Sequence, residues 1–264
     1  MELQLKGKIV LVTGSTAGIG FAAASLFAAE GASVVVNGRT QERVNEAVRQ
    51  IGREHERASI TGIAADLGTR EGFELLAGAL PEVDILVNNL GIYEAKPFIE
   101  IEDSDWEHLF ETNVLSGIRL SRLYLPKMLQ KNWGRIVFVS SESALQIPVE
   151  MIHYGVTKTA QISLARGLAE LTAGSGVTVN SVLPGPTRSE GVEQFVQSLA
   201  KSQSKTASEV EEEFFRAMRP TSLLQRFSTP EEVAAMIVYV CSPQASATNG
   251  AALRVDGGVV RSIV

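Results

Sequence analysis

The chain has 264 residues, of which 45% are hydrophobic, and its 24 basic and 30 acidic side chains give a formal net charge of −6. This acidic balance provides no positive field for nucleic acid or an anionic membrane surface, so we expect neither as a partner. The single Cys241 excludes an internal disulfide and suits a cytoplasmic location, and three histidines far apart in the sequence indicate no metal site.

The chain is expected to form one soluble, unprocessed domain over residues 1–264. Its first residues contain no apolar stretch of signal length, and no later segment has about 18 uninterrupted apolar residues. No internal repeat, low-complexity tract or Pro/Gly/Ser-rich linker divides it.

Short β-branched runs alternate with helical patterns along the chain, which is typical of a parallel sheet. The run Ile9-Val10-Leu11-Val12 is apolar without alternation, as expected of a strand covered by helices on both faces. We therefore predict an α/β, doubly wound fold with seven parallel strands flanked by helices. The strand candidates are residues 8–13, 32–37, 59–65, 84–88, 135–140, 177–183 and 251–255.

Helix signals lie between these strands. Helices are predicted over 18–30, after Thr40 as far as residue 56, and from Ser104 to residue 128. Thr229-Pro230-Glu231-Glu232 is a capping box with proline at the first helical position. Residues 188–226, after the sixth strand, are too long for a simple connector and read as a helical lid.

A glycine-rich loop, Thr13-Gly14-Ser15-Thr16-Ala17-Gly18-Ile19-Gly20, joins the first strand to the first helix. Glycines at this place let the backbone turn sharply and approach a diphosphate, which the N–H groups at the helix start then bind. A plain strand–helix turn is the alternative. We predict that the nucleotide contacts Gly14, Ser15, Thr16, Gly18, Ile19 and Gly20.

The end of the second strand bears on which dinucleotide binds. It reads Asn37-Gly38-Arg39, with no carboxylate to repel a 2′-phosphate, and Arg39 can pair with that phosphate unless it is simply a surface arginine. We predict a preference for NADP, with NAD possible. Asp66 and Leu67 follow the third strand, where Asp66 either accepts from the adenine amino group or caps the next turn.

A serine, a tyrosine and a lysine form the candidate chemical group. Ser141 lies at the end of the fifth strand candidate, and Tyr154 and Lys158 are four residues apart, so they share one face of a predicted helix. The tyrosine–lysine pair alone is more often a surface contact. Its occurrence with a strand-end serine and an upstream dinucleotide loop favours chemistry.

These motifs, together with Asn88-Asn89-Leu90-Gly91, Asn113, Pro184-Gly185 and Val255-Asp256-Gly257-Gly258, follow the order and spacing of the classical short-chain dehydrogenases/reductases. The chain resembles that family from about residue 6 to about residue 258. The resemblance implies a Rossmann fold and hydride transfer between NADP(H) or NAD(H) and a carbonyl or secondary alcohol. Leu90 departs from the family, which usually has alanine there.

The resemblance also implies roles for individual residues. Tyr154 is the general acid or base, Lys158 lowers the pKa of Tyr154 and holds the nicotinamide ribose, and Ser141 donates to the substrate oxygen. Asn113 anchors a water that returns the proton. Further cofactor contacts are implied for Asn89, Gly91, Tyr154, Lys158, Pro184, Gly185 and Thr187.

The substrate stays open at this point. A ketone or 3-oxoacyl reductase is favoured, and a polyol or sugar dehydrogenase and a steroid or xenobiotic ketone reductase are alternatives. Leu90, Ile147, Met151 and Ile152 are candidates for an apolar substrate wall, and six glutamates between residues 189 and 213 suggest an acidic lid.

Three further hypotheses concern the protein as a whole. A dinucleotide-sensing or scaffold protein without catalysis is an alternative to the enzyme, although the intact serine, tyrosine and lysine argue against it. A methyltransferase that binds adenosylmethionine is another doubly wound alternative. By family resemblance we expect a homodimer or homotetramer.

Overall fold

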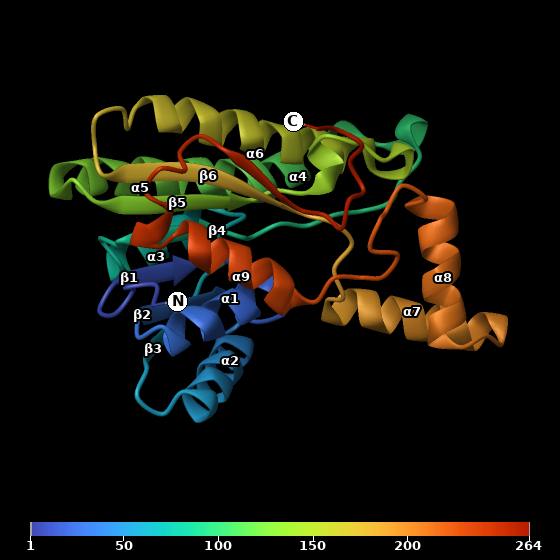
Figure 1. The fold of residues 1–264 in the computed structure, drawn as a ribbon, viewed down its shortest axis with the longest axis horizontal. Coiled ribbons are helices and arrows are strands. Elements are labelled where there is room, and N and C mark those ends of the chain that lie inside the picture. Colours follow the sequence, from blue (N-terminus) through green and yellow to red (C-terminus); the bar gives the residue numbers. More distant parts are fainter. Residues whose placement is uncertain (1, 264) are drawn as a thin grey trace.

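A computed structural model describes residues 2–263, apart from the side chain of Phe195, so Met1 and Val264 at the ends of the predicted domain lie outside the described residues. Seven strands form one parallel sheet in the order β3-β2-β1-β4-β5-β6-β7, which confirms the predicted α/β, doubly wound class (Figure 1). All of them begin and end within one residue of the predicted ranges. They are β1 (Ile9–Val12), β2 (Ser33–Gly38), β3 (Ser59–Ala64), β4 (Ile85–Asn88), β5 (Gly134–Val139), β6 (Val177–Pro184) and β7 (Ala252–Val255).

Helices cover both faces of the sheet. Thr40 and Thr229 cap α2 and α9 through their side chains, as predicted. The helix predicted to follow Ser104 instead begins at Asp103, because Glu102 and Asp105 form its capping box. The helices are α1 (Gly18–Ala29), α2 (Gln41–Glu54), α3 (Arg70–Ala79), α4 (Asp103–Phe110), α5 (Ser116–Lys131), α6 (Ile152–Glu170), α7 (Glu190–Gln203), α8 (Ala207–Met218) and α9 (Pro230–Val240). Within residues 2–263, none of them is both long and apolar enough to cross a membrane.

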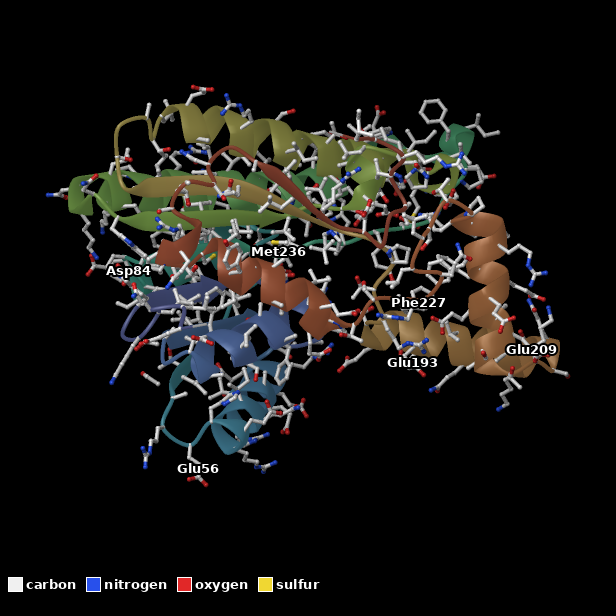
Figure 2. All side chains as sticks on the ribbon, viewed as in Figure 1. Glu56, Asp84, Glu193, Glu209, Phe227 and Met236 are labelled. Carbon is white, nitrogen blue, oxygen red and sulfur yellow. The ribbon has the colours of Figure 1, made fainter. Side chains whose placement is uncertain are left out.

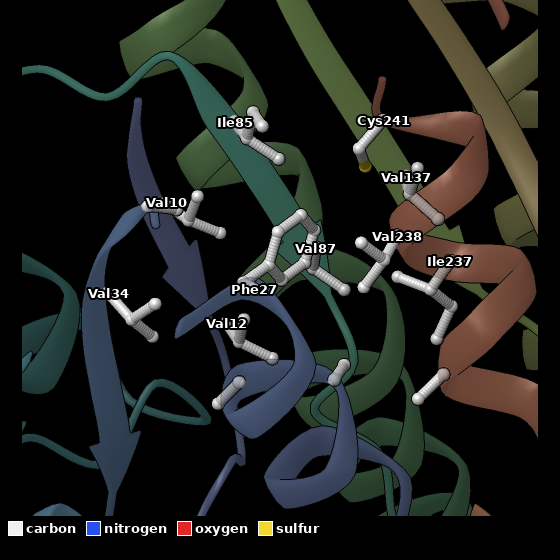
Figure 3. Packing of buried hydrophobic residues seen from close by; sticks show 14 of the residues in the cluster. Val10, Val12, Phe27, Val34, Ile85, Val87, Val137, Ile237, Val238 and Cys241 are labelled. Carbon is white, nitrogen blue, oxygen red and sulfur yellow. The ribbon is translucent and has the colours of Figure 1, made fainter. Parts of the chain in front are cut away.

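The side chains of consecutive strand residues pack into two hydrophobic clusters on opposite faces of the sheet. Val10 and Val12 pack with Phe27 of α1 and Ile237 of α9 on one side of the sheet (Figure 3), whereas Leu11 packs into a second cluster with residues of α3, α5 and α6. Both faces are therefore buried, which explains why the strands lack polar alternation.

The strand order reverses between β1 and β4, which lie side by side in the middle of the sheet. In open parallel sheets, ligands bind at the carboxyl ends of the strands beside such a switch point. The loops after β1, β4, β5 and β6 meet at this edge, and they carry the predicted site residues.

Helices α7 and α8 project from the body of the molecule as a helical arm, residues 188–226 (Figure 1). The ends of the arm are held together by a bridge between Thr187 and Ser228, whose hydroxyl oxygens are 3.0 Å apart. A small separate core, formed by Val196, Ala200, Val210, Phe215 and Phe227, packs the two helices against each other. Figure 2 labels Phe227 where the arm meets the body and Glu209 toward its outer end.

Candidate active site

A cavity of about 720 Å³ opens at the carboxyl edge of the sheet and extends beneath the arm. It collects residues that are far apart in the sequence, from the first helix, the ends of β4, β5 and β6, and the start of α6. The predicted site residues on its wall are Ile19, Asn89, Gly91, Ser141, Tyr154, Lys158, Pro184, Gly185 and Thr187.

The glycine loop after β1 is closely packed against the loop after β4. Gly14 has a φ of +60°, a conformation that favours glycine, and a Cβ atom on Gly20 would lie 2.6 Å from the Gly14 carbonyl oxygen and closer still to Asn89 Nδ2. Asn89 Nδ2 donates to the carbonyl oxygens of Thr13 and Gly14 at 2.9 and 3.0 Å. The Asn89 side-chain amide therefore supports the glycine loop.

The start of α1 is open to an anion. Its N-cap, Ala17, provides no side-chain hydrogen bond and the first turn has no acidic residue, whereas Thr40, Thr69 and Thr229 cap α2, α3 and α9. The first N–H groups of α1 therefore remain available for a diphosphate, and the residues present fit a dinucleotide.

A second cavity of about 180 Å³ adjoins the glycine loop. Arg39 lines it as predicted, and Arg43, which the sequence analysis missed, lies beside it. Arg43 is in the first turn of α2, directly after the strand end that carries Arg39, and this closeness in sequence was the available signal. Two guanidinium groups here suit a 2′-phosphate. The other lining residues are Gly14, Thr16, Asn37, Gly38, Thr40, Ala65, Asp66, Leu67 and Leu90.

Some predicted cofactor residues have their polar groups engaged within the protein. Ser15 Oγ donates to the Val12 carbonyl oxygen at 2.6 Å and accepts from Asn37 N. The Asn37 amide donates to backbone carbonyl oxygens of Ile63 and Ala65. Asp66 Oδ1 accepts from Gly68 N at 3.0 Å, which is the turn-capping alternative. These side chains therefore hold the backbone around the predicted nucleotide site.

Tyr154 and Ser141 lie together at one wall of the main cavity. The Ser141 hydroxyl is close enough to Tyr154 to lower the pKa of its phenol, and Ser141 Oγ donates to Glu142 Oε2 at 2.6 Å. Lys158 is one helical turn further along α6, with Nζ 5.6 Å from the centroid of the Tyr154 ring. The structure thus brings the serine, tyrosine and lysine to one place.

The surroundings of Tyr154 shift the pKa of its hydroxyl group. Burial raises the pKa of the Tyr154 hydroxyl well above its ordinary value, and Glu142 raises it further, while the hydrogen bond with Ser141 and the charge of Arg219 oppose the rise. Lys158 Nζ donates instead to the Val139 carbonyl oxygen at 2.9 Å. Without a nucleotide, Tyr154 is therefore a neutral phenol at neutral pH. An effect of Lys158 on the pKa of Tyr154, expected together with the positive nicotinamide of the oxidised cofactor, stays a prediction.

Burial also lowers the pKa of Lys158 to about 8, so its ammonium form predominates at neutral pH and is lost as the pH rises through that value. Besides Val139, Nζ donates to Gln161 Oε1 at 3.3 Å. Gln161 Nε2 in turn donates to the Asn113 carbonyl oxygen at 2.5 Å. This buried chain links the lysine to Asn113.

Asn113 lies in a π-helical turn, Glu111–Leu115, which interrupts the long predicted helix between α4 and α5. Its side-chain oxygen accepts from Ile92 N at 2.8 Å, and Nδ2 donates to Ile92 O and Thr157 Oγ1. Single π-helical turns are frequent at functional sites. The side chain of Asn113 thus fixes the loop after β4 against α6.

An ion pair beside these groups was not predicted. Glu142 follows Ser141 directly, and its carboxylate accepts from Arg219 Nε at 3.0 Å, with the two side chains only 6% and 10% exposed. Arg219 ends α8 and also contacts Glu150 Oε1 at 3.4 Å. Nothing in the sequence pairs Glu142 or Glu150 with an arginine of the arm, because Arg219 is 77 residues from Glu142.

The apolar part of the main cavity comes mostly from the arm. Of the four residues predicted as a substrate wall, only Met151 lines this cavity; Leu90 lines the smaller one and Ile147 is 44% exposed. Helices α7 and α8 pack across the opening and so provide the wall that the sequence did not reveal. The apolar residues from this region are Val192, Val196, Leu199, Val210, Phe214, Met218 and Phe227.

Most carboxylates of the arm are bonded to cationic side chains or to a helix N-terminus. Arg188 bonds to Glu193 and Glu211, Arg43 of α2 reaches Glu190 at 3.2 Å, and Lys205 reaches Glu213 at 2.6 Å. Glu209 completes the capping box at the start of α8. The segment is acidic in composition, as predicted, but most of its carboxylates are bonded to a cation or to a helix N-terminus.

Known proteins of similar sequence and structure share this arrangement of elements. Residues 8–200 match the family model described as short chain dehydrogenase. The chain is 50% identical to the uncharacterized oxidoreductase YvaG of Bacillus subtilis, with both chains covered completely. It is 33% identical to the 3-oxoacyl-[acyl-carrier-protein] reductase FabG of Aquifex aeolicus, covering 98% of this chain and 100% of that protein. The crystal structure of L-sorbose reductase from Gluconobacter frateurii, complexed with NADPH and L-sorbose, superposes with a TM-score of 0.93 at 29% identity over both whole chains.

Proposed function

Because the chain belongs to the short-chain dehydrogenase/reductase family of oxidoreductases, we propose that it uses NADPH to reduce a ketone to a secondary alcohol, and that NADH is a weaker alternative. The observation that carries this proposal is the cavity in which Ser141, Tyr154 and Lys158 meet an apolar wall. The nucleotide, when bound, supplies the hydride.

The chain's own residues handle the proton and the substrate oxygen. Tyr154, kept neutral by burial, donates its proton to the carbonyl oxygen, and Ser141 donates a second hydrogen bond to that oxygen as negative charge develops there. Lys158 keeps a positive charge beneath the tyrosine, and its chain through Gln161 to Asn113 holds it there. In the reverse direction Tyr154 accepts the proton.

Cofactor selection is assigned to Arg39 and Arg43. Both line the small cavity beside the glycine loop, and the described residues lining it include one carboxylate, Asp66, which is engaged with Gly68 N. This charge balance supports NADPH over NADH. The L-sorbose reductase is similar in fold and was crystallised with NADPH.

The apolar wall supports a substrate with a hydrocarbon substituent, such as a 3-oxoacyl compound or an alkyl ketone, over a sugar. A sugar would leave its hydroxyl groups facing Val192, Leu199 and Phe214 without hydrogen-bond partners. We assign to the arm the role of a lid that closes over this substituent.

A panel of ketones with NADPH and NADH tests the proposal. Each methylene added to a straight-chain methyl ketone is expected to lower KM by about fourfold, corresponding to about 0.8 kcal/mol per buried methylene, until the cavity is full. Val192→Phe, which narrows the cavity, should remove this gain, whereas Gln194→Phe on the exposed side of α7 should keep it.

Two outcomes would contradict the proposal. Binding of NADPH, measured by its fluorescence, without turnover of any ketone or alcohol would favour the non-catalytic alternative. Turnover of L-sorbose in preference to every alkyl ketone would contradict the assigned substrate class.

A further inference from the structure

A buried carboxylate lies next to the reacting groups, and its counter-charge comes from the arm. Glu142 directly follows Ser141, and Arg219, 77 residues away in the sequence, covers it from the end of α8. Both side chains are at least nine-tenths buried. Two charges that are buried to this extent must be paired. Removal of one of them leaves the other charge buried without a partner, which has a high cost in folding free energy.

The hydrogen bonds of Glu142 do not depend on Ser141. Its Oε2 accepts from Ser141 Oγ at 2.6 Å, but also from Ser143 N at 2.8 Å and Ser143 Oγ at 3.1 Å. When Ser141 turns its hydroxyl toward a substrate oxygen, Oε2 keeps two donors. The carboxylate can therefore release Ser141 without becoming unsatisfied.

The charge of Glu142 is the larger difficulty. Reduction places negative charge on the substrate oxygen beside Ser141 and Tyr154, and a nearby carboxylate opposes that charge. The guanidinium of Arg219, bonded to the same carboxylate, offsets this effect. The two charges also act on the pKa of Tyr154 in opposite directions, since Glu142 raises it and Arg219 lowers it.

The other charged groups around the cavity do not replace Arg219. Lys158 directs its ammonium at the Val139 carbonyl oxygen, and Glu213 is paired with Lys205. Tyr93, whose ring is 6.1 Å from that of Tyr154, is a second phenol, and Glu150 adds negative charge on the far side of Arg219.

We propose that Arg219 is a positioning residue for ketone reduction: it neutralises Glu142, so that Ser141 and Tyr154 act on the substrate oxygen without an unbalanced negative charge beside them. Because Arg219 belongs to the arm, this neutralisation requires the arm to be packed against the body. The inference rests on the proposed function.

The test compares Arg219→Gln, Glu142→Gln and the variant with both changes. Arg219→Lys retains the charge, and Arg216→Gln, which changes an exposed arginine three residues earlier on α8, is the matched control. The pH dependence of kcat is measured with NADPH and the best ketone of the panel.

In Arg219→Gln the carboxylate of Glu142 loses its counter-charge, so its negative charge lies beside Ser141 and Tyr154 without a bonded cation. Turnover should fall relative to wild type, more at high pH than in acid, where protonation of carboxylates removes their charge. The fall should be at most about tenfold for each unit by which the pKa of Tyr154 rises. The double variant should return to near wild-type turnover at all pH values. Arg219→Lys and Arg216→Gln should keep the wild-type profile.

A second measurement needs no turnover. The Cζ signal of ¹³C-labelled Tyr154, assigned with the Tyr154→Phe variant, is followed by NMR as the pH is raised. Tyr154 should deprotonate at a lower pH in Glu142→Gln than in the double variant, because only the former retains the charge of Arg219.

Two results would overturn the inference: a loss of turnover in Arg219→Gln that is the same at every pH and is not rescued by Glu142→Gln, or identical titrations of Tyr154 in Glu142→Gln and the double variant. If the wild-type protein reduces no ketone, the proposed function fails, and with it the role of Arg219 in reduction. The NMR titration then still shows whether Arg219 offsets the charge of Glu142 at Tyr154.

Discussion

The body of the molecule and its arm are built in different ways. In the body, strands are buried on both faces and two continuous apolar clusters hold the helices against them. The arm has a core of a few residues around Phe215 and Phe227, and it reaches the body through ion pairs such as Arg219–Glu142 and Arg43–Glu190.

This difference separates two tasks. The groups proposed for chemistry, Ser141, Tyr154 and Lys158, lie at strand ends and on a helix of the body, where packing fixes their positions. The residues proposed to contact the substrate lie largely on the arm. A segment with a small core and exposed charges opens at a lower free-energy cost than the sheet, which is what a substrate lid requires.

The largest effect is expected from a substitution that removes a proposed catalytic group of the body and leaves the arm unchanged. Tyr154→Phe should lower kcat by about a thousandfold, since it removes the proton donor, while the Kd for NADPH, measured by fluorescence titration, stays close to wild type. Tyr239→Phe, at a half-exposed tyrosine of α9, is the control and should be neutral. Turnover within a few fold of wild type in Tyr154→Phe would show that another group donates the proton.

A matched pair of phenylalanines compares the two cores directly. Phe27→Ala in the body should lower the free energy of unfolding by about 3–5 kcal/mol, because Phe27 is fully buried in a large cluster. Phe227→Ala removes the partner of Phe214, 5.0 Å away ring to ring, and should mainly loosen the arm.

Hydrogen exchange and thermal unfolding distinguish these outcomes. In Phe227→Ala, amides of α7 and α8 should exchange faster while those of β1 and β4 keep wild-type protection, and KM for the ketone should rise more than kcat falls. Equal losses of global stability in the two variants would mean that the arm and the body unfold as one unit.

A smaller effect tests nucleotide selection by the body. Arg39→Gln should weaken NADPH binding by about tenfold, equivalent to about 1.4 kcal/mol, through loss of a charge-assisted contact with the 2′-phosphate. NADH binding should change little. Arg53→Gln, in the last turn of the same α2 helix that carries Arg43, is the control. Parallel weakening of both nucleotides would argue against a phosphate contact at Arg39.

The smallest effect is expected where the arm rejoins the body. A hydrogen bond from Arg226, together with the N–H group of Thr229, lowers the pKa of Glu232 from 4.5 to about 2 at the start of α9. The carboxylate therefore stabilises the fold above pH 4.5, and this contribution is lost as the pH falls through the lowered value.

Glu232→Gln should accordingly lower Tm by about 2 °C at neutral pH, a small change because the group is nearly half exposed to solvent. The difference from wild type should disappear in acid. A difference that persists at pH 2 would mean that packing, not charge, stabilises this end of α9.

The body was largely predictable because its signals are local. The unbroken apolar runs, the glycine loop and the four-residue spacing of Tyr154 and Lys158 each depend on neighbours in the sequence. The π-helical turn at Asn113 was not predicted, since its flanks have an ordinary helical pattern.

The arm was predictable as helical, but its contacts were not. Arg219 meets Glu142 and Arg43 meets Glu190 across 77 and 147 residues of sequence, and no periodicity reports such pairs. The substrate wall was misplaced for the same reason: Val192 and Phe214 look like the apolar faces of ordinary helices until the arm folds across the cavity.

The bridge between Thr187 and Ser228, which joins the two ends of the arm, bears on how the arm could be replaced. Because side-chain and backbone hydrogen bonds hold both ends of the arm side by side, we expect that the segment between them can be replaced without a change in the register of the sheet. If the arm sets the substrate as proposed, replacing it with a segment of different length or lining should change which carbonyl compounds are accepted, provided that the replacement also carries an arginine for Glu142.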